Sequence, residues 1–235
     1  MILIVDNRIS EECERSLLKE GHLLIKLPKD PSLSNAICSH PDTLLFYSNG
    51  RIITTADYCD AAAYVFSDIR ELAPEVKITF TSDIRKNCYP DDCIMNALVA
   101  GGCLFCKEDT VSATIKEYAT EAGLKIVNTK QGYPACSVLH FGDSAITSDN
   151  GLANLMSKNG INVTLIRPGY ISLPPYDYGF IGGASGVVGK KVYFFGDISN
   201  HPDCEKICDA INSAGYTVVS LSKGDLADLG GIIAL

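Results

Sequence analysis

Short apolar runs alternate with amphipathic stretches along the whole chain, and they do so in a recurring order. Two apolar, β-branched runs come first, a stretch with apolar residues at helical spacing follows, and a third apolar run ends the unit. The helical stretches stop at Gly21, Gly123, Gly160 and Gly215, and once at Pro74, residue types that commonly end a helix. The order predicts a strand–strand–helix–strand unit that repeats roughly every 47 residues.

Runs of the same type have related sequences in the different units. The third runs are KEGHLLIKL, LAPEVKITF, EAGLKIVNT, KNGINVTLI and SAGYTVVSL. The second runs are RIITTAD, CLFCKED, SAITSDN and VYFFGDISN, and the first runs are TLLFYSNG, CIMNALVAGG, CSVLHFGD and YGFIGGASG. Polar residues lie before the helical stretches, and we expect Ser10, Asp57, Thr110, Asp149 and Asn200 to cap the five helices.

The two ends of the chain look like parts of one unit. The first unit has only MILIVDN before its helix, and LGGIIAL at the C-terminus is a first strand with no unit behind it. Two unpaired edge strands would favour aggregation. We therefore expect the terminal strands to pair, which completes a fifth unit and closes the five units into a ring.

Five such units in a closed ring resemble the pentein fold, an α/β-propeller. The resemblance is to the guanidino-group-modifying enzymes, in particular to a bacterial branch whose function is open, and it spans the whole chain. It implies an α/β fold of five ββαβ units in a single domain, residues 1–235. A doubly wound α/β sheet is the alternative, but that layout has one strand per helix, whereas paired strands precede nearly every helix here.

Composition narrows the possible partners. Of the 235 residues, 46% are hydrophobic and 20% are charged, which predicts a folded chain with a large core. The net charge is −8 and no Lys/Arg-rich run is present, so a nucleic-acid or anionic-membrane partner is disfavoured. The chain has no basic leader and no apolar stretch near ~20 residues, and we expect a cytoplasmic protein.

Titratable residues cluster just before the first strands of the units, which would place them around the central pore. Ordinary turn chemistry is the alternative explanation for acidic residues at such positions. In the first run of the last of these units, YGFIGGASG, the two glycines Gly182 and Gly183 would belong to a glycine-rich hairpin and form a pocket wall. The predicted set before the first strands is His40, Asp42, Asp91, Asp92, Cys136, Asp177 and Asp228.

The resemblance implies a catalytic chemistry, and this chain departs from it. The enzymes use a Cys nucleophile near the C-terminus, a His in an H-x-D or H-x-E motif, and carboxylates that pair with a guanidinium group. Here the C-terminal segment reads DLADLGG, and no Cys follows Cys208. A rotated site remains, with Cys136 as nucleophile, His40 and Asp42 in the H-x-D motif, and Asp177 pairing with the guanidinium. A lowered thiol pKa at Cys136 would mark such a site.

Three functions therefore stay open. The first is binding of a small polar ligand at the pore, with guanidinium compounds among the candidates, and it predicts no cofactor. The second is a Cys-dependent hydrolase or transferase with the rotated site. The third is an interaction module, as for the ribosome anti-association factor that shares the fold. The ligand-binding residues predicted for the first function are Asp91, Asp92, Asp177, Asp228, Gly182 and Gly183.

The remaining cysteines and histidines offer weaker alternatives. A metal cluster of Cys88, Cys93, Cys103 and Cys106 is disfavoured, because residues three apart on a strand face opposite sides and no second CxxC follows. We predict no metal site. Two histidines outside the rotated site have structural explanations: His140 inside an apolar strand and His201 on a solvated helix start.

Overall fold

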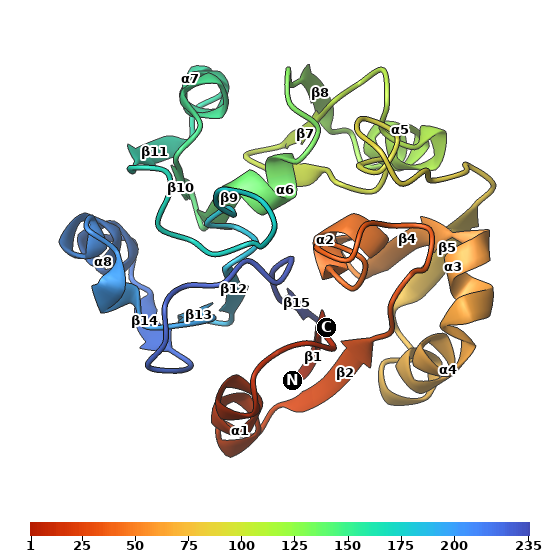
Figure 1. The fold of residues 1–235 in the computed structure, drawn as a ribbon. Helices are drawn as coiled ribbons and strands as arrows, with labels where there is room; N and C mark the ends of the chain where they lie inside the picture. The colour runs from red at the N-terminus through yellow and green to blue at the C-terminus, as the bar shows by residue number, and fades with distance from the viewer.

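Five separate three-stranded sheets make up the fold. The computed structural model describes residues 1–235 and groups fifteen strands into these sheets. In Figure 1 the sheets surround a common centre, with the longer helices at the periphery. The overall class is mixed α/β, and the sheets contain strands β1–β2–β15, β3–β4–β5, β6–β7–β8, β9–β10–β11 and β12–β13–β14.

The strands are short, as expected for small units packed around a centre. In the four consecutive units, the first two strands are antiparallel and the second and third are parallel, which confirms the predicted unit. Their bounds are β1 Ile2–Asp6, β2 Leu23–Leu27, β3 Phe46–Ser48, β4 Arg51–Thr55, β5 Lys77–Thr81, β6 Leu98–Ala100, β7 Cys103–Cys106, β8 Lys125–Asn128, β9 Val138–Phe141, β10 Ser144–Thr147, β11 Asn162–Leu165, β12 Ser185–Val188, β13 Lys191–Phe194, β14 Thr217–Ser220 and β15 Ile233–Ala234.

Helices connect the second and third strands of every unit, as the amphipathic stretches predicted. No helix is both long and apolar enough to cross a membrane. The helix bounds are α1 Glu11–Lys19, α2 Pro41–Leu44, α3 Ala56–Ala61, α4 Ala63–Leu72, α5 Ala113–Glu121, α6 Pro134–Ser137, α7 Asn150–Lys158 and α8 Cys204–Ser213, with a 3₁₀ turn, η1, at Ile198–Asn200.

Two of the five predicted helix caps are confirmed, and three are wrong. Ser10 accepts a hydrogen bond from the Cys13 backbone N–H, and Asp149 accepts one from the Leu152 N–H. In the second unit the last residue of β4 already caps the helix, so the helix begins earlier than expected. The observed N-cap residues are Thr55, Ser112 and Asp203 in place of Asp57, Thr110 and Asn200.

The first strands are shorter than the apolar runs that predicted them. Single helical turns, α2 and α6, take up the residues before β3 and β9. In the last of these units, residues 180–184 form a turn and the strand begins only at Ser185. Gly182 and Gly183 therefore lie in the turn before β12. Their predicted place inside the β12–β13 hairpin is wrong, since Gly189 and Lys190 form that hairpin's tip.

The hydrophobic core consists of five clusters, and each cluster joins two neighbouring units. In one of them Leu139 and Phe141 of β9 pack with Phe194 of β13. In another, Tyr193 of the last unit packs with Leu3 of β1. Because each unit shares its core with the next and the last shares one with the first, no unit buries its apolar face alone.

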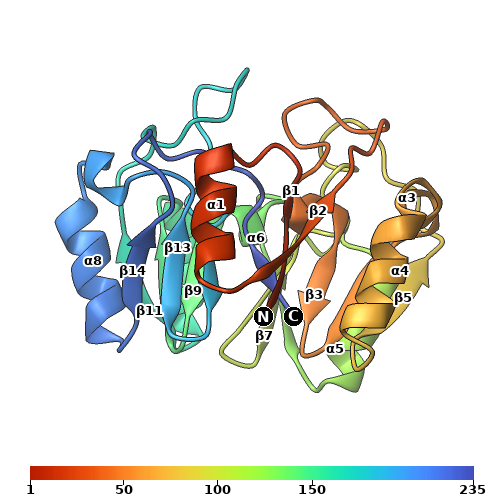
Figure 2. The same ribbon diagram turned by 90° about the horizontal axis from the view of Figure 1, so that it is seen from below.

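The two chain ends pair, as the sequence predicted. Strand β15 is antiparallel to β1, with Leu3 opposite Ala234 and Ile4 opposite Ile233. The Leu235 backbone N–H also donates to the Ile2 carbonyl at 2.9 Å. Figures 1 and 2 place both termini side by side, on the inner side of the ring of sheets and at the lower end of the molecule in Figure 2. The composite sheet β15–β1–β2 thus has the same pairing as the other four.

This arrangement predicts that the chain can be circularly permuted. In the second unit, Asn49-Gly50 joins Ser48 of β3 to Arg51 of β4. Replacing Met1 by Asn-Gly, joined to the C-terminal residue, would give β15 and β1 the same two-residue turn, a good type I′ sequence. With new ends opened at the β12–β13 hairpin tip, we expect a folded protein with circular dichroism and melting temperature close to those of the parent.

A matched control uses the same linker but opens the chain inside strand β4. That permutant should be poorly folded, because it breaks a central strand of a unit. If the hairpin-opened permutant were also unfolded, the pairing of β1 with β15 would not be equivalent to the hairpins of the other units.

Candidate functional site

A cavity of about 470 Å³ lies at the end of the molecule where the long loops project. These loops, residues 28–40 and 167–180, stand at the top of Figure 2, opposite the two termini. Three predicted site residues line the cavity wall nearest the centre: His40, Cys136 and Asp228. Each of them belongs to the segment that enters the first strand of its unit, so the repeat itself brings them together.

The five entering segments are hydrogen-bonded to one another in a closed circuit around the centre. The Asp42 backbone N–H donates to the Gly230 carbonyl at 3.1 Å, and the Gly183 N–H donates to the Cys136 carbonyl at 2.9 Å. The Leu229 N–H donates to the Gly183 carbonyl, also at 2.9 Å. This belt fixes the backbone of the turns that carry the polar side chains.

One side chain, Asn96, completes the belt, and the sequence analysis missed it. Its Nδ2 donates to the Asp42 carbonyl at 3.0 Å and to the Cys136 Sγ at 3.2 Å. Its Oδ1 accepts from the Ala135 N–H at 2.8 Å. Asn96 lies in the segment that enters β6, just as Asp42 and Cys136 lie in the segments that enter β3 and β9, so the repeat was the signal that could have found it.

Cys136 is buried beside two carboxyl groups. Cys136 is 4% exposed, and this burial raises the pKa of its thiol well above the usual value. The nearby Asp42 and Asp228 carboxylates raise the thiol pKa further. The hydrogen bond from Asn96 acts in the opposite direction and lowers the thiol pKa. A lowered thiol pKa would have marked the rotated catalytic site, and Cys136 shows the opposite direction, because the sequence could not show how much acid surrounds this thiol.

The two carboxyl groups are also forced toward their neutral forms. Burial raises the pKa of Asp42 to about 6 and that of Asp228 to about 7, and the charge of Asp42 adds to the effect on Asp228. Asp228 accepts hydrogen bonds from the Phe180 N–H at 2.9 Å and the Gly230 N–H at 3.1 Å. A buried pair of acids with raised pKa values would be relieved by a cation placed beside it.

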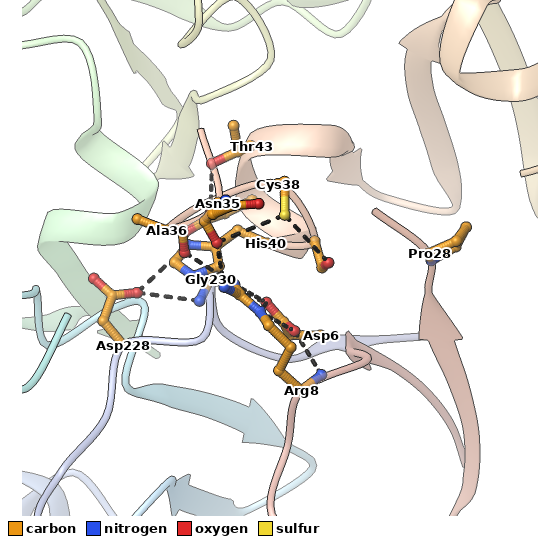
Figure 3. Close-up of polar contacts among 12 residues, drawn as sticks. Asp6, Arg8, Pro28, Asn35, Ala36, Cys38, His40, Thr43, Asp228 and Gly230 are labelled. Carbon is orange, nitrogen blue, oxygen red and sulfur yellow. Dashed lines mark hydrogen bonds and ion pairs between the residues drawn. The ribbon is translucent and has the colours of Figure 1, made fainter. Parts of the chain in front are cut away.

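His40 stands between two acids in Figure 3. Its Nδ1 is 3.7 Å from the Asp228 Oδ1, and its Nε2 is 3.9 Å from the Asp6 Oδ2. Neither ring nitrogen has a hydrogen-bond partner within the protein. Burial lowers the pKa of His40 to about 4, so the ring is neutral at pH 7. A neutral imidazole donates a hydrogen bond from one ring nitrogen and accepts one at the other.

An ion pair between the half-buried Arg8 and the buried Asp6 holds the loop that contains His40. The Arg8 guanidinium binds both carboxylate oxygens of Asp6, and its Nη2 lies 2.6 Å from the Asp6 Oδ2. The same guanidinium donates to the carbonyls of Asn35 at 2.6 Å and Ala36 at 2.9 Å, as Figure 3 shows. Strand β1 therefore fixes residues 35–40, although the sequence gave no sign of this role for Arg8.

Glycines allow the entering turns to approach one another closely. A Cβ on Gly182 would come within 2.6 Å of the Cys136 carbonyl oxygen, and one on Gly183 within 2.5 Å of the Asp228 Cγ. A Cβ on Gly230, whose φ is +69°, would come within 2.6 Å of the His40 Cα. Larger residues here would push the catalytic candidates apart.

The other predicted ligand-binding residues divide between the cavity and the outside. Asp92 and Asp177 line the cavity, Asp92 buried and Asp177 exposed at the rim. Asp91 does not line it and instead pairs with Lys86 on the surface, at 2.7 Å between Oδ2 and Nζ. Asp42 faces a second cavity of about 400 Å³, which the first strands enclose on the far side of the belt.

The alternatives for the remaining cysteines and histidines can now be compared with the structure. No group of three or more His, Cys, Asp or Glu side chains is arranged to hold a metal ion. Cys103 and Cys106 face different core clusters, as expected for residues three apart on a strand. His140 lies on β9, as predicted. The solvated position predicted for His201 is wrong, since it is 1% exposed and its Nδ1 accepts from the Asp203 N–H.

Several solved structures with a similar fold are guanidino-group-modifying enzymes. One is a dimethylarginine dimethylaminohydrolase carrying an adduct with S-methyl-L-thiocitrulline: TM-score 0.57, 11% identity, 94% of this chain and 92% of that one covered. A second is an amidinotransferase of saxitoxin biosynthesis from Microseira wollei: TM-score 0.57, 10% identity, 94% and 77% covered. A third is the C. jejuni agmatine deiminase: TM-score 0.55, 8% identity, 94% and 76% covered.

These similarities establish the fold class: the protein has the pentein fold of that superfamily. At the level of families, the profile described as "Family of unknown function (DUF6873)" matches residues 4–233, and the chain belongs to this family. A search of curated proteins returned no match to the sequence.

The belt predicts a large effect for a single polar residue. Asn96→Ala removes three hydrogen bonds from a buried site, and we expect a loss of unfolding free energy of about 2–4 kcal/mol. Asn87→Ala is the matched control, because Asn87 is exposed at the cavity rim, and it should change stability by less than about 0.5 kcal/mol. Urea unfolding of both variants tests this, and equal stabilities would exclude a structural role for the belt.

The raised pKa of Asp42 predicts a pH-dependent stability difference. A carboxyl group whose pKa is higher in the folded state stabilises the fold below its unfolded pKa, near 4, and this contribution is lost as pH rises through about 6. Asp42→Asn removes the titration, so its stability relative to wild type should rise between pH 4 and 7, by about 2–3 kcal/mol at most. Urea unfolding at several pH values measures the difference.

Asp91→Asn is the control for that experiment, since Asp91 is paired at the surface. Its stability relative to wild type should stay nearly constant over the same pH range. A constant difference for Asp42→Asn as well would mean that Asp42 is not buried as an acid in solution.

Proposed function

We propose that this protein is a Cys-dependent enzyme that acts on a cationic guanidine or amidine group, with Cys136 as the nucleophile. The observation that carries the proposal is the position of the Cys136 thiol, between Asp42 and Asp228 at the wall of a cavity. The fold similarity to guanidino-group-modifying enzymes agrees with this chemistry.

The charge balance of the site favours a cationic ligand. With Asp42 and Asp228 both ionised, two negative charges would be buried beside Cys136, and Asp228 lines the cavity itself. A planar guanidinium beside Asp228 would compensate this charge and donate two parallel N–H groups to a carboxylate. The same cation, next to the thiol, would lower the thiol pKa and form the thiolate only when a ligand is bound.

The covalent step uses groups that already adjoin the thiol. The thiol proton moves to the Asp42 carboxylate, and the Cys136 Sγ forms a bond to the central carbon of the guanidinium. One C–N bond breaks, and the departing nitrogen takes the proton from Asp42. Water then attacks the thiouronium carbon and releases the product and the thiol, with His40 accepting a proton from that water. Asn96, through its N–H, stabilises the thiolate.

We also propose that residues 1–235 act as one domain closed into a ring. The belt of hydrogen bonds and the five shared clusters support this, because they join the last unit to the first. Only a ring of this kind keeps Asp228 of one end of the chain beside His40 and Cys136.

A ring that binds cations without catalysis is the second candidate. The raised pKa of Cys136 favours it, because a thiol is a weak nucleophile. The two candidates differ in whether a bound cation activates the thiol.

The experiment compares two alkylating agents of the same size and shape. 2-Chloroacetamidine is a cation, and 2-chloroacetamide is its neutral counterpart; each forms an S–C bond and releases chloride. At pH 7.5 we expect the amidine to label Cys136 at least about tenfold faster than the amide, as peptide mapping by mass spectrometry would show. Cys88, exposed at the same cavity, is the internal control and should show a smaller ratio.

Asp228→Asn should reduce the ratio at Cys136 toward that of Cys88, provided that its circular dichroism shows an intact fold. Equal labelling of Cys136 by the two reagents in the wild type would contradict the proposed enzyme. If guanidines then still raised the melting temperature, the cation-binding ring would be favoured.

A further inference from the structure

The cavity that holds Cys136 has a second polar wall, formed by a different unit. Asp92, in the segment before β6, is buried there, and its Oδ1 has no hydrogen-bond partner. On the first wall, both ring nitrogens of His40 are likewise without partners, and the residue is 1% exposed. Buried polar atoms are costly unless they are hydrogen-bonded, so both walls are suited to a ligand that carries N–H donors.

Tyr133 keeps Asp92 in its place. Burial raises the pKa of both Tyr133 and Asp92. The interaction of the tyrosine hydroxyl with the Asp92 carboxyl raises the pKa of Tyr133 further. The charge of Cys136 also acts on Tyr133. The thiol thus has two sets of polar neighbours, the acids Asp42 and Asp228 and the Tyr133–Asp92 pair, and Tyr133 and Asp92 line the same cavity as Cys136.

Aromatic rings surround the opening between these walls. Tyr89 is 51% exposed, Tyr176 is 53% exposed and Tyr178 is 40% exposed, and all three line the cavity. Exposed aromatic rings at a cavity mouth bind apolar chains and attract cations through their faces. A ligand chain that leaves Cys136 toward the opening would run along them.

The charged side chains that line the cavity are all acidic: Asp92, Asp177 and Asp228. No Lys or Arg lines the cavity, and three cationic side chains beside its lining segments are paired with acids: Arg8 binds Asp6, Arg85 binds Asp30 and Lys86 binds Asp91. A carboxylate on the ligand would meet only negative charge, and such like-charge contacts weaken binding strongly.

We infer that the site selects a dication without a carboxylate: a guanidinium group at Cys136 joined by an apolar chain to an amine that Asp92 and the rim residue Asp177 attract. This inference rests on the proposed function and specifies its substrate class. The distal amine would donate to the free Asp92 Oδ1, and the chain would pack against the tyrosines.

The test is calorimetric binding to a Cys136→Ser variant, which prevents turnover. Four ligands separate the contributions of the guanidinium, the amine and the carboxylate to binding. Agmatine has both cations, n-butylguanidine only the guanidinium and 1,4-diaminobutane only amines, whereas arginine adds a carboxylate beside its amine. We expect agmatine to bind most tightly and arginine at least about tenfold more weakly than agmatine.

Asp92→Asn, made in the same background, assigns the second wall. It should weaken agmatine to the level of n-butylguanidine and leave the affinity for n-butylguanidine unchanged. Asp91→Asn, one residue earlier and paired at the surface, is the matched control and should change neither affinity.

The outcomes distinguish the inference from the function on which it rests. If guanidines bind but arginine equals agmatine, or if Asp92→Asn weakens n-butylguanidine as much as agmatine, the dication inference is overturned and the proposed function stands. If no guanidine binds, or if 1,4-diaminobutane binds as tightly as agmatine, the proposed function fails and the inference fails with it.

Discussion

The closed belt of hydrogen bonds around the centre is the feature on which the rest of the structure depends. It runs from Gly230 to Asp42, through the side chain of Asn96 to Ala135, and from Cys136 through Gly183 back to the last segment. Without the pairing of β15 with β1, the segment that contains Gly230 would have no fixed place. The fold and the candidate site therefore share one constraint, which is the joining of the two ends of the chain.

The site shows how a ring of repeated units concentrates charge. Every unit directs one entering segment toward the same centre, and in this sequence several of these segments carry acids. The Asp42 and Asp228 carboxyl groups are thus buried close to the Cys136 thiol, and the buried Asp6, at the end of β1, lies beside the His40 imidazole. Burial raises the pKa of the two acids beside Cys136 and lowers that of His40, so no side chain of the site supplies a positive charge at pH 7 to balance the acids. A cationic ligand is the simplest compensation for such a site.

Strain and close packing accompany this concentration. Gly182, Gly183 and Gly230 have no room for a side chain, because backbone or acid atoms of the neighbouring turns occupy the space. Proteins often give up stability at such centres in exchange for function. The buried acids beside Cys136 and the unpartnered nitrogens of His40 follow the same rule, since nothing in the fold alone requires them.

The sequence by itself determined the repeating unit, the pairing of the chain ends and the group of entering residues that includes His40, Asp42, Cys136 and Asp228. These follow from local signals: hydrophobic periodicity, glycine stops, and the position of polar residues relative to the strands. The sequence did not determine the role of Asn96, the place of Gly182 or the protonation of Cys136. These depend on contacts between residues 40 or more positions apart, such as Asn96 with Cys136 and Asp42. Only the tertiary structure decides which groups lose water together, and that loss sets their pKa values.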